Sequence, residues 1–437
     1  MIDLRLYRKR FEYKAVIMHF ELKYGDGSLP LDLDPSRILS VVLPNTRSTL
    51  GDARNAVRKA LAQPEGTEPL LEMLIDRKPK KLVIIVNDIT RPTPYSILMP
   101  ALVEVIEKAG IPDENVTILI ATGIHDLHTY EQNLLVYGEE ICSRFKIISH
   151  DASDSSMLSY KGKLPSGYDF WLNRIVDEAD FLITIGVVMP HYFAGFSGGR
   201  KSILPGVVGK QTVERNHARM VEIMDNLPPI RENPISLEMI HAARIAGVDF
   251  ILNVVVDEGE NVVEVVAGDL EKAWYKAVDV SQAMYMIPIP GKADITISAA
   301  SGFPRDINLY QAQKALDHAD RATKRGGTII LIAECRNGYG EKVFEEFMNA
   351  GYSPEEIMSR IKAHFVMGGH KAYGFAKVAA EKRVIMVTAL SESIVSSCFA
   401  QKASSLDAAI EMAIAQQGPK AKFIIMPEGS IAAPVIL

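Results

Sequence analysis

The chain has 437 residues, more than the roughly 250–300 at which a single hydrophobic core stops growing, so two domains are expected. Hydrophobic residues make up 48% and charged residues 23%, as in an ordinary globular protein, and the net charge of −6 argues against a nucleic-acid partner. Three scattered cysteines exclude a disulfide framework and favour a reducing cytoplasm, while the lack of a long apolar run or an N-terminal apolar segment argues against a membrane span and a signal peptide.

The first predicted elements alternate between strand and helix. A continuous apolar run over 81–87 predicts a buried parallel strand, and the helix predicted over about 95–109 ends at Gly110. Two more strands are predicted over 116–122 and 181–188. This alternation is typical of α/β layers with largely parallel sheets.

A second unit of the same kind follows a proline-rich linker at 288–291. It is predicted to contain a strand over 293–300, a helix over about 309–324, a break at Gly326-Gly327 and a strand over 328–333. The chain is therefore expected to fold into two α/β domains, with an active-site cleft between them.

The domain boundaries follow from these patterns. Residues 1–287 are assigned to an N-terminal domain and 288–410 to a C-terminal domain. The last stretch contains a predicted helix over 406–416 and a predicted strand over 421–426. We expect residues 411–437 to return and complete the N-terminal domain.

The stretch Met189–Gly206 is the most informative part of the sequence, because it combines a histidine, several glycines, an arginine, a lysine and a serine in one loop after a strand. Glycines allow close approach to a ligand, and free amides suit anions. Lys201 followed by a serine suggests a phosphate, yet the loop is not a Walker A motif: counted from Gly195, Arg200 stands where the second glycine must be. A surface loop with incidental charges is the competing interpretation.

Polar residues also follow the other predicted strands. Because ligands of open α/β sheets bind at the carboxyl ends of the strands, these loops could converge on one crevice. The candidates are Asp88 and Arg91, then His125, Asp126 and His128, then His191, Lys201 and His217, and in the second unit the loop 301–306 with Tyr310, Gln311 and Lys314.

Most histidines are better interpreted as structural. His125 and His191 differ because both stand at strand ends beside glycine; the structural interpretation is given to His128, His150, His241, His318, His364 and His370. The histidine spacing matches no zinc motif. Ser197 lies in a Gly-x-Ser-x-Gly pattern, but the loop continues beyond it instead of leading into a helix, which disfavours a hydrolase elbow.

Taken together, these motifs resemble the nickel-pincer lactate racemase family from about Val83 to Lys371. The motifs that carry the resemblance, in the family's order, are Asp88-x-x-Arg91, Thr122-Gly-x-His125, the run from His191 through Ala194-Gly-Phe-Ser-Gly-Gly to Lys201, His217, and Tyr310-Gln-x-x-Lys314. Members of this family carry a nickel-pincer mononucleotide, the nickel complex of pyridinium-3,5-bisthiocarboxylic acid mononucleotide, which is attached covalently to a lysine.

The resemblance implies a role for each residue. Lys201 would carry the cofactor, His217 would bind nickel, and His125 and His191 would transfer protons. The substrate-binding residues would be Arg91, Tyr310, Gln311 and Lys314, and the residues accommodating the cofactor and its phosphate would be Asp88, Ser197, Gly198, Gly199 and Arg200.

The implied reaction is the racemisation or epimerisation of a 2-hydroxy acid by reversible hydride transfer. A histidine with a pKa near ~6.5 suits proton transfer on either face of the substrate. Two sulfurs, a ring carbon and one imidazole would give nickel a square plane. The implied partners are a small 2-hydroxy acid and the enzymes that build the cofactor.

One departure bears on the substrate. The family's lactate enzymes place a tryptophan in a region that here reads Gly368 to Phe375, so Tyr373 or Phe375 would replace it and another 2-hydroxy acid becomes plausible. Two alternatives remain: a nicotinamide-dependent dehydrogenase, although no G-x-G-x-x-G follows a strand, and a non-catalytic nickel- or nucleotide-binding protein.

Overall fold

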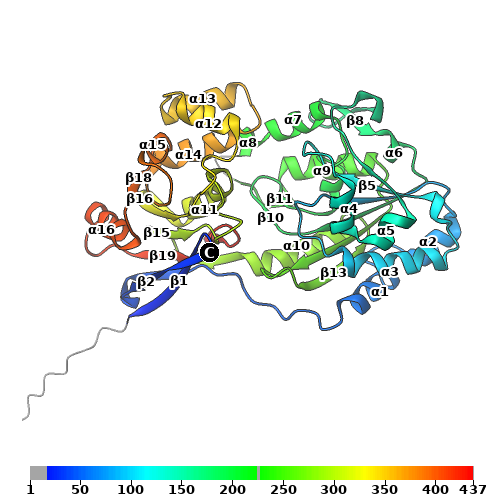
Figure 1. Cartoon of the computed structure of the whole chain (residues 1–437), viewed down its shortest axis with the longest axis horizontal. Coiled ribbons are helices and arrows are strands. Elements are labelled where there is room, and N and C mark those ends of the chain that lie inside the picture. Colours follow the sequence, from blue (N-terminus) through cyan, green and yellow to red (C-terminus); the bar gives the residue numbers. More distant parts are fainter. Residues whose placement is uncertain (1–16, 224–226, 437) are drawn as a thin grey trace, which may run out of the picture. The chain divides into compact units, whose positions relative to one another are not determined.

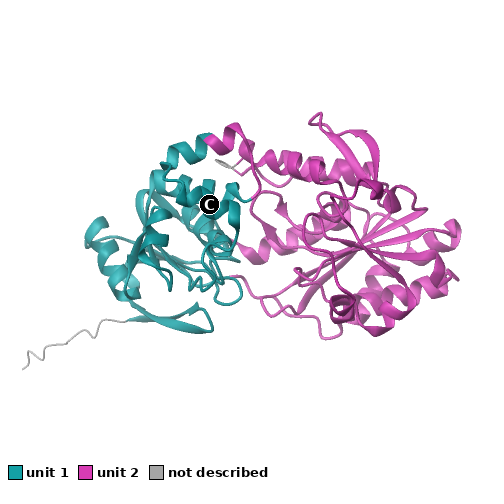
Figure 2. Cartoon of the chain, turned by 45° about the horizontal axis from the view of Figure 1, so that its top comes forward, with its two compact units in different colours: residues 1–43, 287–359, 368–437 teal, residues 44–286, 360–367 magenta. Residues whose placement is uncertain are grey.

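The computed structural model describes residues 17–223 and 227–436, which form two compact units, coloured separately in Figure 2. Unit 2 comprises residues 44–286 and 360–367. Unit 1 comprises 287–359 and 368–437 together with the N-terminal segment up to Leu43.

Unit 2 is built around a six-stranded sheet with the order β13-β12-β9-β4-β5-β6 (Figure 1). All of its neighbouring strands pair in parallel except β13 with β12. The strands in this order are β13 (Val262–Gly268), β12 (Phe250–Val256), β9 (Phe181–Val187), β4 (Leu82–Asn87), β5 (Val116–Ala121) and β6 (Lys146–Ser149).

Helices and two short hairpins complete unit 2. The core lies where alternate residues of β4, such as Leu82, Ile84 and Val86, pack against apolar residues of α3, such as Leu102 and Ile106. The helices are α1 (Ala53–Ala62), α2 (Leu70–Arg77), α3 (Tyr95–Lys108), α4 (Tyr130–Tyr137), α5 (Glu139–Arg144), α6 (Arg174–Asp177), α7 (Lys210–Ala218), α8 (Met220–Ile223), α9 (Pro234–Ile245) and α10 (Lys272–Tyr285). The hairpins pair β7 (Leu158–Lys163) with β8 (Asp169–Asn173) and β10 (Pro190–His191) with β11 (Gly195–Phe196).

Unit 1 contains a second six-stranded sheet, with the order β18-β17-β16-β15-β19-β3, in which every neighbouring pair is parallel. These strands are β18 (Gln401–Ala403), β17 (Arg383–Val387), β16 (Thr323–Ile332), β15 (Ala293–Ala299), β19 (Phe423–Met426) and β3 (Ile38–Val41). The other strands are the hairpin β1 (Met18–Tyr24) and β2 (Gly27–Leu33) and the pair β14 (Met286–Ile289) and β20 (Ala433–Ile436). The helices are α11 (Leu309–Ala322), α12 (Lys342–Asn349), α14 (Gly369–Glu381), α15 (Glu392–Ser397) and α16 (Leu406–Gln417), together with α13 (Pro354–Ala363), which passes into unit 2 at residue 360.

The α/β class, the two-domain organisation and most predicted elements are confirmed, including strands β4, β5 and β9 and helices α3 and α16. The domain boundaries differ from the prediction at both ends. Residues 411–437 do not complete the N-terminal domain, because β19 pairs with β15 and β3 inside the unit 1 sheet. The segment up to Leu43 also belongs to unit 1, because β3 forms the edge of that sheet.

The predicted break at Gly326-Gly327 lies inside a strand instead. Strand β16 begins at Thr323, and its pairing with β15 shifts from Ala293–Thr323 to Ile295–Thr328. The intervening residues bulge, and Gly326 adopts a φ of +74° there. A Cβ at Gly327 would lie 2.8 Å from the Asp294 carbonyl oxygen, so glycine at this position allows the close approach of β15.

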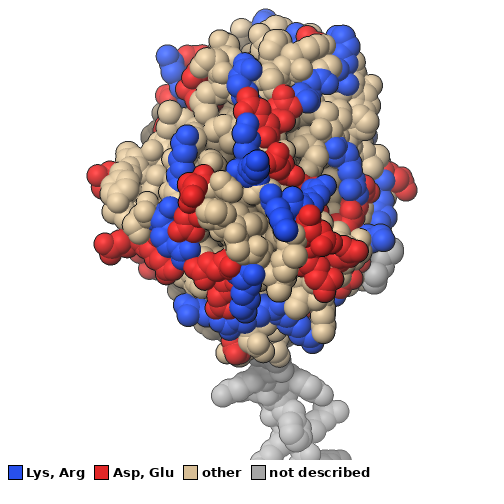
Figure 3. All heavy atoms as spheres, turned by 90° about the vertical axis from the view of Figure 1, so that its right-hand side faces the viewer, with Lys and Arg blue, Asp and Glu red and all other residues tan. Residues whose placement is uncertain are grey.

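Charged side chains of both signs are interspersed on the face drawn in Figure 3. Exposed ion pairs occur in unit 2, where Arg144 contacts Glu107, Asp113 and Glu140, and Arg58 contacts Glu104. Such exposed pairs contribute little stability, so each unit is stabilised mainly by its own apolar core. Within the described ranges, no helix is long and apolar enough to cross a membrane.

Replacing Phe423 by alanine should destabilise unit 1, because this ring is fully buried in β19 and stacks with the guanidinium of Arg37 at 4.9 Å. We expect the free energy of unfolding to fall by about 3–5 kcal/mol, measured by urea denaturation. Hydrogen exchange should accelerate in β15, β19 and β3. Val435→Ala, at an exposed position of β20, serves as the control. Hydrogen exchange that accelerates in unit 2 alone would contradict the assignment of β19 to the sheet of unit 1.

Candidate active site

Three loops of unit 2 leave the same edge of its sheet, because β9, β4 and β5 are neighbours and run in parallel. The loop after β4 contains Asp88 and Arg91, and the loop after β5 contains His125. The loop after β5 is tied to the third loop by a hydrogen bond from the Gly123 amide to the Gly206 carbonyl (2.9 Å). The sequence-predicted loops of unit 2 are therefore adjacent.

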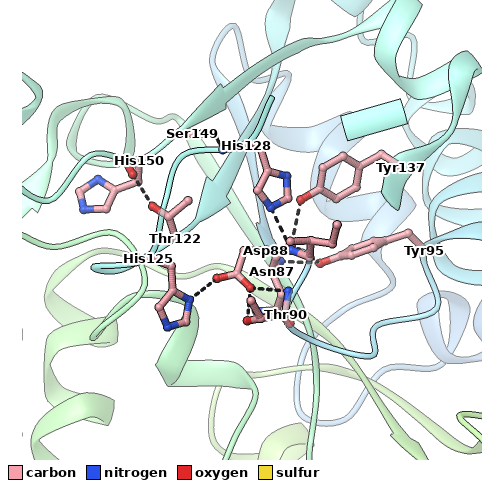
Figure 4. Close-up of polar contacts among 11 residues, drawn as sticks. Asn87, Asp88, Thr90, Tyr95, Thr122, His125, His128, Tyr137, Ser149 and His150 are labelled. Carbon is pink, nitrogen blue, oxygen red and sulfur yellow. Dashed lines mark hydrogen bonds and ion pairs between the residues drawn. The ribbon is translucent and has the colours of Figure 1, made fainter. Parts of the chain in front are cut away.

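Asp88 and His125 form a hydrogen-bonded pair at this edge (Figure 4). The distance from the Nδ1 atom of His125 to Oδ2 of Asp88 is 2.7 Å; the aspartate side chain is 4% exposed and the histidine side chain 44%. The other oxygen of Asp88 accepts hydrogen bonds from the amide (2.9 Å) and the hydroxyl of Thr90. Asp88 was predicted to bind the cofactor; its carboxylate contacts His125, and the cofactor contact stays a prediction.

The pair favours the ionised form of Asp88. Burial raises the pKa of Asp88, but the hydrogen bonds from His125 and Thr90 outweigh it, so the pKa lies below its ordinary value. The ionised carboxylate can only accept, so the hydrogen bond between them places a proton on Nδ1 of His125 and directs Nε2 away from Asp88.

The residues around this pair in Figure 4 hold the two loops in shape. Tyr137 donates to the Asn87 carbonyl (2.7 Å), and Nε2 of His128 accepts the Ile89 amide (2.9 Å). His150 is buried and bonds to Asn173 and to the Val208 carbonyl. The structural interpretation of His128 and His150 is confirmed.

Phe193 brings three predicted site residues together. Its ring centroid lies 4.6 Å from that of His191 and 4.9 Å from that of His217, and the Nζ atom of Lys201 lies 5.5 Å from it. Phe193 occupies the turn between β10 and β11, where His191 pairs with Gly195. The sequence interpretation missed this residue, although its place in the middle of the glycine motif was a usable signal.

The surroundings of His191 differ from those of His125. The backbone amide of Ala194 donates to Nδ1 of His191 (3.4 Å). The two histidines therefore have different hydrogen-bond partners at Nδ1, a carboxylate for His125 and a backbone amide for His191.

The glycine loop is anchored to the sheet by Ser197, Gly198 and Gly199. The Ser197 hydroxyl donates to the Val187 carbonyl (2.7 Å), and the Gly199 amide donates to the Asn253 side chain (2.9 Å). Gly198 has a φ of +76°, and a Cβ there would lie 2.6 Å from Val188. Glycine is required at this position by both the backbone conformation and the close packing.

Arg200 is buried beneath the loop, and its position does not support the predicted contact with a phosphate. Its side chain is fully buried and donates to the carbonyls of Ala194 (2.7 Å) and Phe196 (2.9 Å) and to the Ser236 hydroxyl. Its guanidinium carbon lies 3.6 Å from the ring centroid of the buried Trp274, a cation–π contact. These contacts satisfy the donors of the guanidinium within the protein and cover one of its faces.

The surroundings of Lys201 and His217 disfavour the charged form of each side chain. Burial, together with the charges of Arg91 and Arg200, keeps the pKa of Lys201 well below its ordinary value. Burial and the charge of Lys201 lower the pKa of His217 to about 3. A neutral amine is a nucleophile, and a neutral imidazole is a metal ligand.

His217 also has an unsatisfied atom. Its Nδ1 atom is buried without a hydrogen-bond partner among the described residues. Residues 17–223 and 227–436 contain no cluster of three or more His, Cys, Asp or Glu side chains that could hold a metal ion. Any metal held by His217 would therefore need most of its ligands from a non-protein group.

The remaining predicted residues lie in unit 1, at the start of α11. The Asn308 side chain caps this helix by accepting the Gln311 amide (2.9 Å), and the Lys314 amine donates to the Gln311 side chain (2.9 Å). The ring of Tyr310 packs against those of Phe344 and His370. Tyr373 and Phe375, the predicted substitutes for the family's tryptophan, are both 1% exposed in the core of unit 1.

Family models and known proteins match nearly the whole chain. A model described as the lactate racemase N-terminal domain matches residues 24–226, and one described as the lactate racemase C-terminal domain matches residues 290–434. A lactate racemase of Thermoanaerobacterium thermosaccharolyticum is 34% identical over 427 residues, covering 94% of this chain and 98% of that protein. A lactate racemase of Lactiplantibacillus plantarum is 36% identical over 386 residues, covering 86% of this chain and 89% of that protein.

Solved structures agree with these matches. The structure of the lactate racemase apoprotein from Thermoanaerobacterium thermosaccharolyticum has a TM-score of 0.89 at 32% identity, covering 96% of this chain and all of that one. The structure of a Thermotoga maritima protein has a TM-score of 0.66 at 18% identity, and the match covers 90% of this chain and all of that one. At this identity the similarity is evidence for the fold alone.

Replacing Arg200 by methionine should destabilise the glycine loop, because the buried carbonyls of Ala194 and Phe196 would lose their donors. We expect a loss of about 2–4 kcal/mol in the free energy of unfolding, measured by denaturant titration. Lys210→Met, on the exposed side of α7, is the control and should be neutral. If Arg200→Met were as stable as the parent protein, the anchoring role would be excluded.

Proposed function

This chain belongs to the lactate racemase family, and we propose that it interconverts the enantiomers of lactate or of a closely related 2-hydroxy acid. Racemases are isomerases, so the protein is an enzyme of that class. The observation that carries the proposal is that His125 and His191 follow neighbouring parallel strands, near a lysine whose pKa is lowered and a buried imidazole with an unpartnered Nδ1 atom.

The residues at this edge fit a nickel-pincer mononucleotide. Burial lowers the pKa of the Lys201 amine, which favours the neutral form that covalent attachment through nitrogen requires. His217, whose buried Nδ1 atom has no hydrogen-bond partner among the described residues, would be the protein ligand of nickel, and the cofactor would supply the other ligands. The absence of a protein metal cluster in the described residues agrees with a metal that arrives already ligated.

When bound, this group would accept the α-hydrogen of the substrate as a hydride and return it. Ser197, Gly198 and Gly199, proposed as cofactor-binding residues, would act mainly by fixing the loop that presents Lys201. Loading depends on the enzymes that build the cofactor, which are the proposed protein partners.

His125 would take the hydroxyl proton of one enantiomer on its Nε2 atom. Its ring is oriented by Asp88, and the imidazolium that forms is stabilised by the adjacent carboxylate. His191, as an imidazolium, would deliver a proton to the oxygen of the oxo acid when the hydrogen returns to the other face, and would become neutral in that step. In the reverse direction the two histidines exchange these tasks.

The substrate carboxylate and hydroxyl would be held by cationic and amide side chains. Arg91 is exposed beside the same edge and is close enough for its charge to lower the pKa of Lys201, and a guanidinium can bind a carboxylate in bidentate fashion. We propose the same task for Tyr310, Gln311 and Lys314, of which the latter two are hydrogen-bonded to each other.

The activity can be tested on protein produced together with the cofactor-building enzymes. Chiral chromatography should show D-lactate forming from L-lactate, and the reverse, without an added nicotinamide dinucleotide. Lys201→Ala should show the bare polypeptide mass, and His217→Ala should keep the adduct but lose nickel, whereas Lys210→Ala should keep both. An unchanged adduct mass in Lys201→Ala would rule out the attachment site. Accumulation of the oxo acid with a required dinucleotide would support a dehydrogenase instead.

Replacing Asp88 by asparagine should lower kcat by about 10²–10⁴ in both directions, because asparagine can no longer hold His125 in the required tautomer. Asparagine has nearly the same volume and can still accept from Thr90, so the thermal unfolding midpoint should change little. Asp126→Asn, at the exposed neighbour of His125, is the matched control. A kcat for Asp88→Asn within about threefold of the parent enzyme would refute the orienting role.

A further inference from the structure

Unit 1 contains a buried lysine that the proposed function does not use. Lys371, near the start of α14, is 2% exposed. Burial, reinforced by the charge of Lys314, lowers the pKa of Lys371 to about 7. Placing an amine inside a protein costs free energy that an apolar side chain of the same length would not. Its presence calls for an explanation beyond packing.

The contacts of Lys371 point to the first turns of α11. Its Nζ atom donates to the side-chain oxygen of Gln313 (3.0 Å) and lies 4.9 Å from the ring centroid of Tyr310. Tyr310 and Gln313 are three residues apart, so they share one ridge of the helix. The lysine thus contacts two successive turns of α11 from the neighbouring helix.

The two helices are closely packed at this contact. A Cβ on Gly374, three residues after Lys371, would lie 3.1 Å from the Cδ atom of Gln313. Glycine at this position leaves room for the Gln313 amide between α11 and α14, with its oxygen directed toward Lys371. The amide of Gln313 therefore has a defined orientation.

The adjacent ridge of α11 carries the proposed substrate-binding groups. Gln311 and Lys314 are also three residues apart, and the amine of Lys314 donates to the oxygen of Gln311. A displacement of the turn that holds Tyr310 and Gln313 would move Gln311 and Lys314 with it, because all four lie within five consecutive residues of one helix.

We propose that Lys371 is a positioning residue for substrate binding: through Gln313 and Tyr310 it fixes the first turns of α11, and thereby the side chains of Gln311 and Lys314 that receive the hydroxy acid. The inference rests on the proposed function of these two residues. Lys371 itself, being buried, acts through its neighbours and transfers no proton.

The test compares Lys371→Met with Lys377→Met in the cofactor-loaded enzyme. Lys377 is the matched control, since it lies on the same helix but pairs with Asp320. With L-lactate and D-lactate as probes, Lys371→Met should raise KM about tenfold while kcat stays within about threefold, as expected for the loss of one hydrogen bond to a charged group. Lys377→Met should change neither constant. Thermal unfolding is measured for both.

A second variant, Gln313→Leu, removes the partner of the lysine and covers the case in which Lys371→Met does not fold. It should raise KM to a similar extent, and the double variant should be no worse than either single one. An unchanged KM in folded Lys371→Met or Gln313→Leu overturns the proposal, as does an equal rise in Lys377→Met, which would indicate a purely structural effect. If the parent enzyme racemises neither lactate enantiomer, the proposed lactate racemase activity is refuted. If the parent enzyme is active and the variants keep its KM, only the positioning role of Lys371 is refuted.

Discussion

The packing of Arg200 beneath the glycine loop is the interaction on which the candidate site depends. A charged side chain without exposure is stable only if its hydrogen bonds and charge are satisfied within the protein. Here two backbone carbonyls, the Ser236 hydroxyl and the indole of Trp274 satisfy it. These carbonyls belong to the loop that contains His191 and Lys201. The loop therefore adopts its conformation around this guanidinium.

The second consequence of this loop is electrostatic. Lys201 and His217 both lie in surroundings that disfavour charge: burial is the main cause for each, Arg91 and Arg200 add to it for Lys201, and Lys201 adds to it for His217. Burying an amine and an imidazole without an ion pair is unfavourable for stability, and perturbed pKa values of this kind are typical of functional sites.

The two histidines at the ends of the parallel strands lie in different surroundings. The Nδ1 atom of His125 contacts the buried carboxylate of Asp88, whereas the Nδ1 atom of His191 contacts the backbone amide of Ala194. The ring of His191 also packs edge-on against Phe193. The orientation of each ring is therefore determined by its own loop and its neighbours.

The sequence by itself determined the fold class, the order of the elements and the residues at the strand ends. Buried parallel strands are continuous apolar runs, and their carboxyl ends carry the polar loops, so Asp88, His125 and His191 could be found from the pattern along the chain. Within unit 2 the loops are adjacent because β9, β4 and β5 are neighbours. The sequence suggested that these strands share a sheet but did not give their order in it.

Tertiary structure alone decided what each side chain contacts. Arg200 follows the glycines as a phosphate-binding arginine would, yet its side chain lies inward on Trp274, a residue 74 positions away that no local pattern connects to it. Asp88 contacts His125 across two strands, and β19 joins unit 1 through pairing with β3, nearly 400 residues earlier. Local propensity fixes elements because it acts over a few residues, whereas burial and long-range pairing depend on which segments the whole chain brings together.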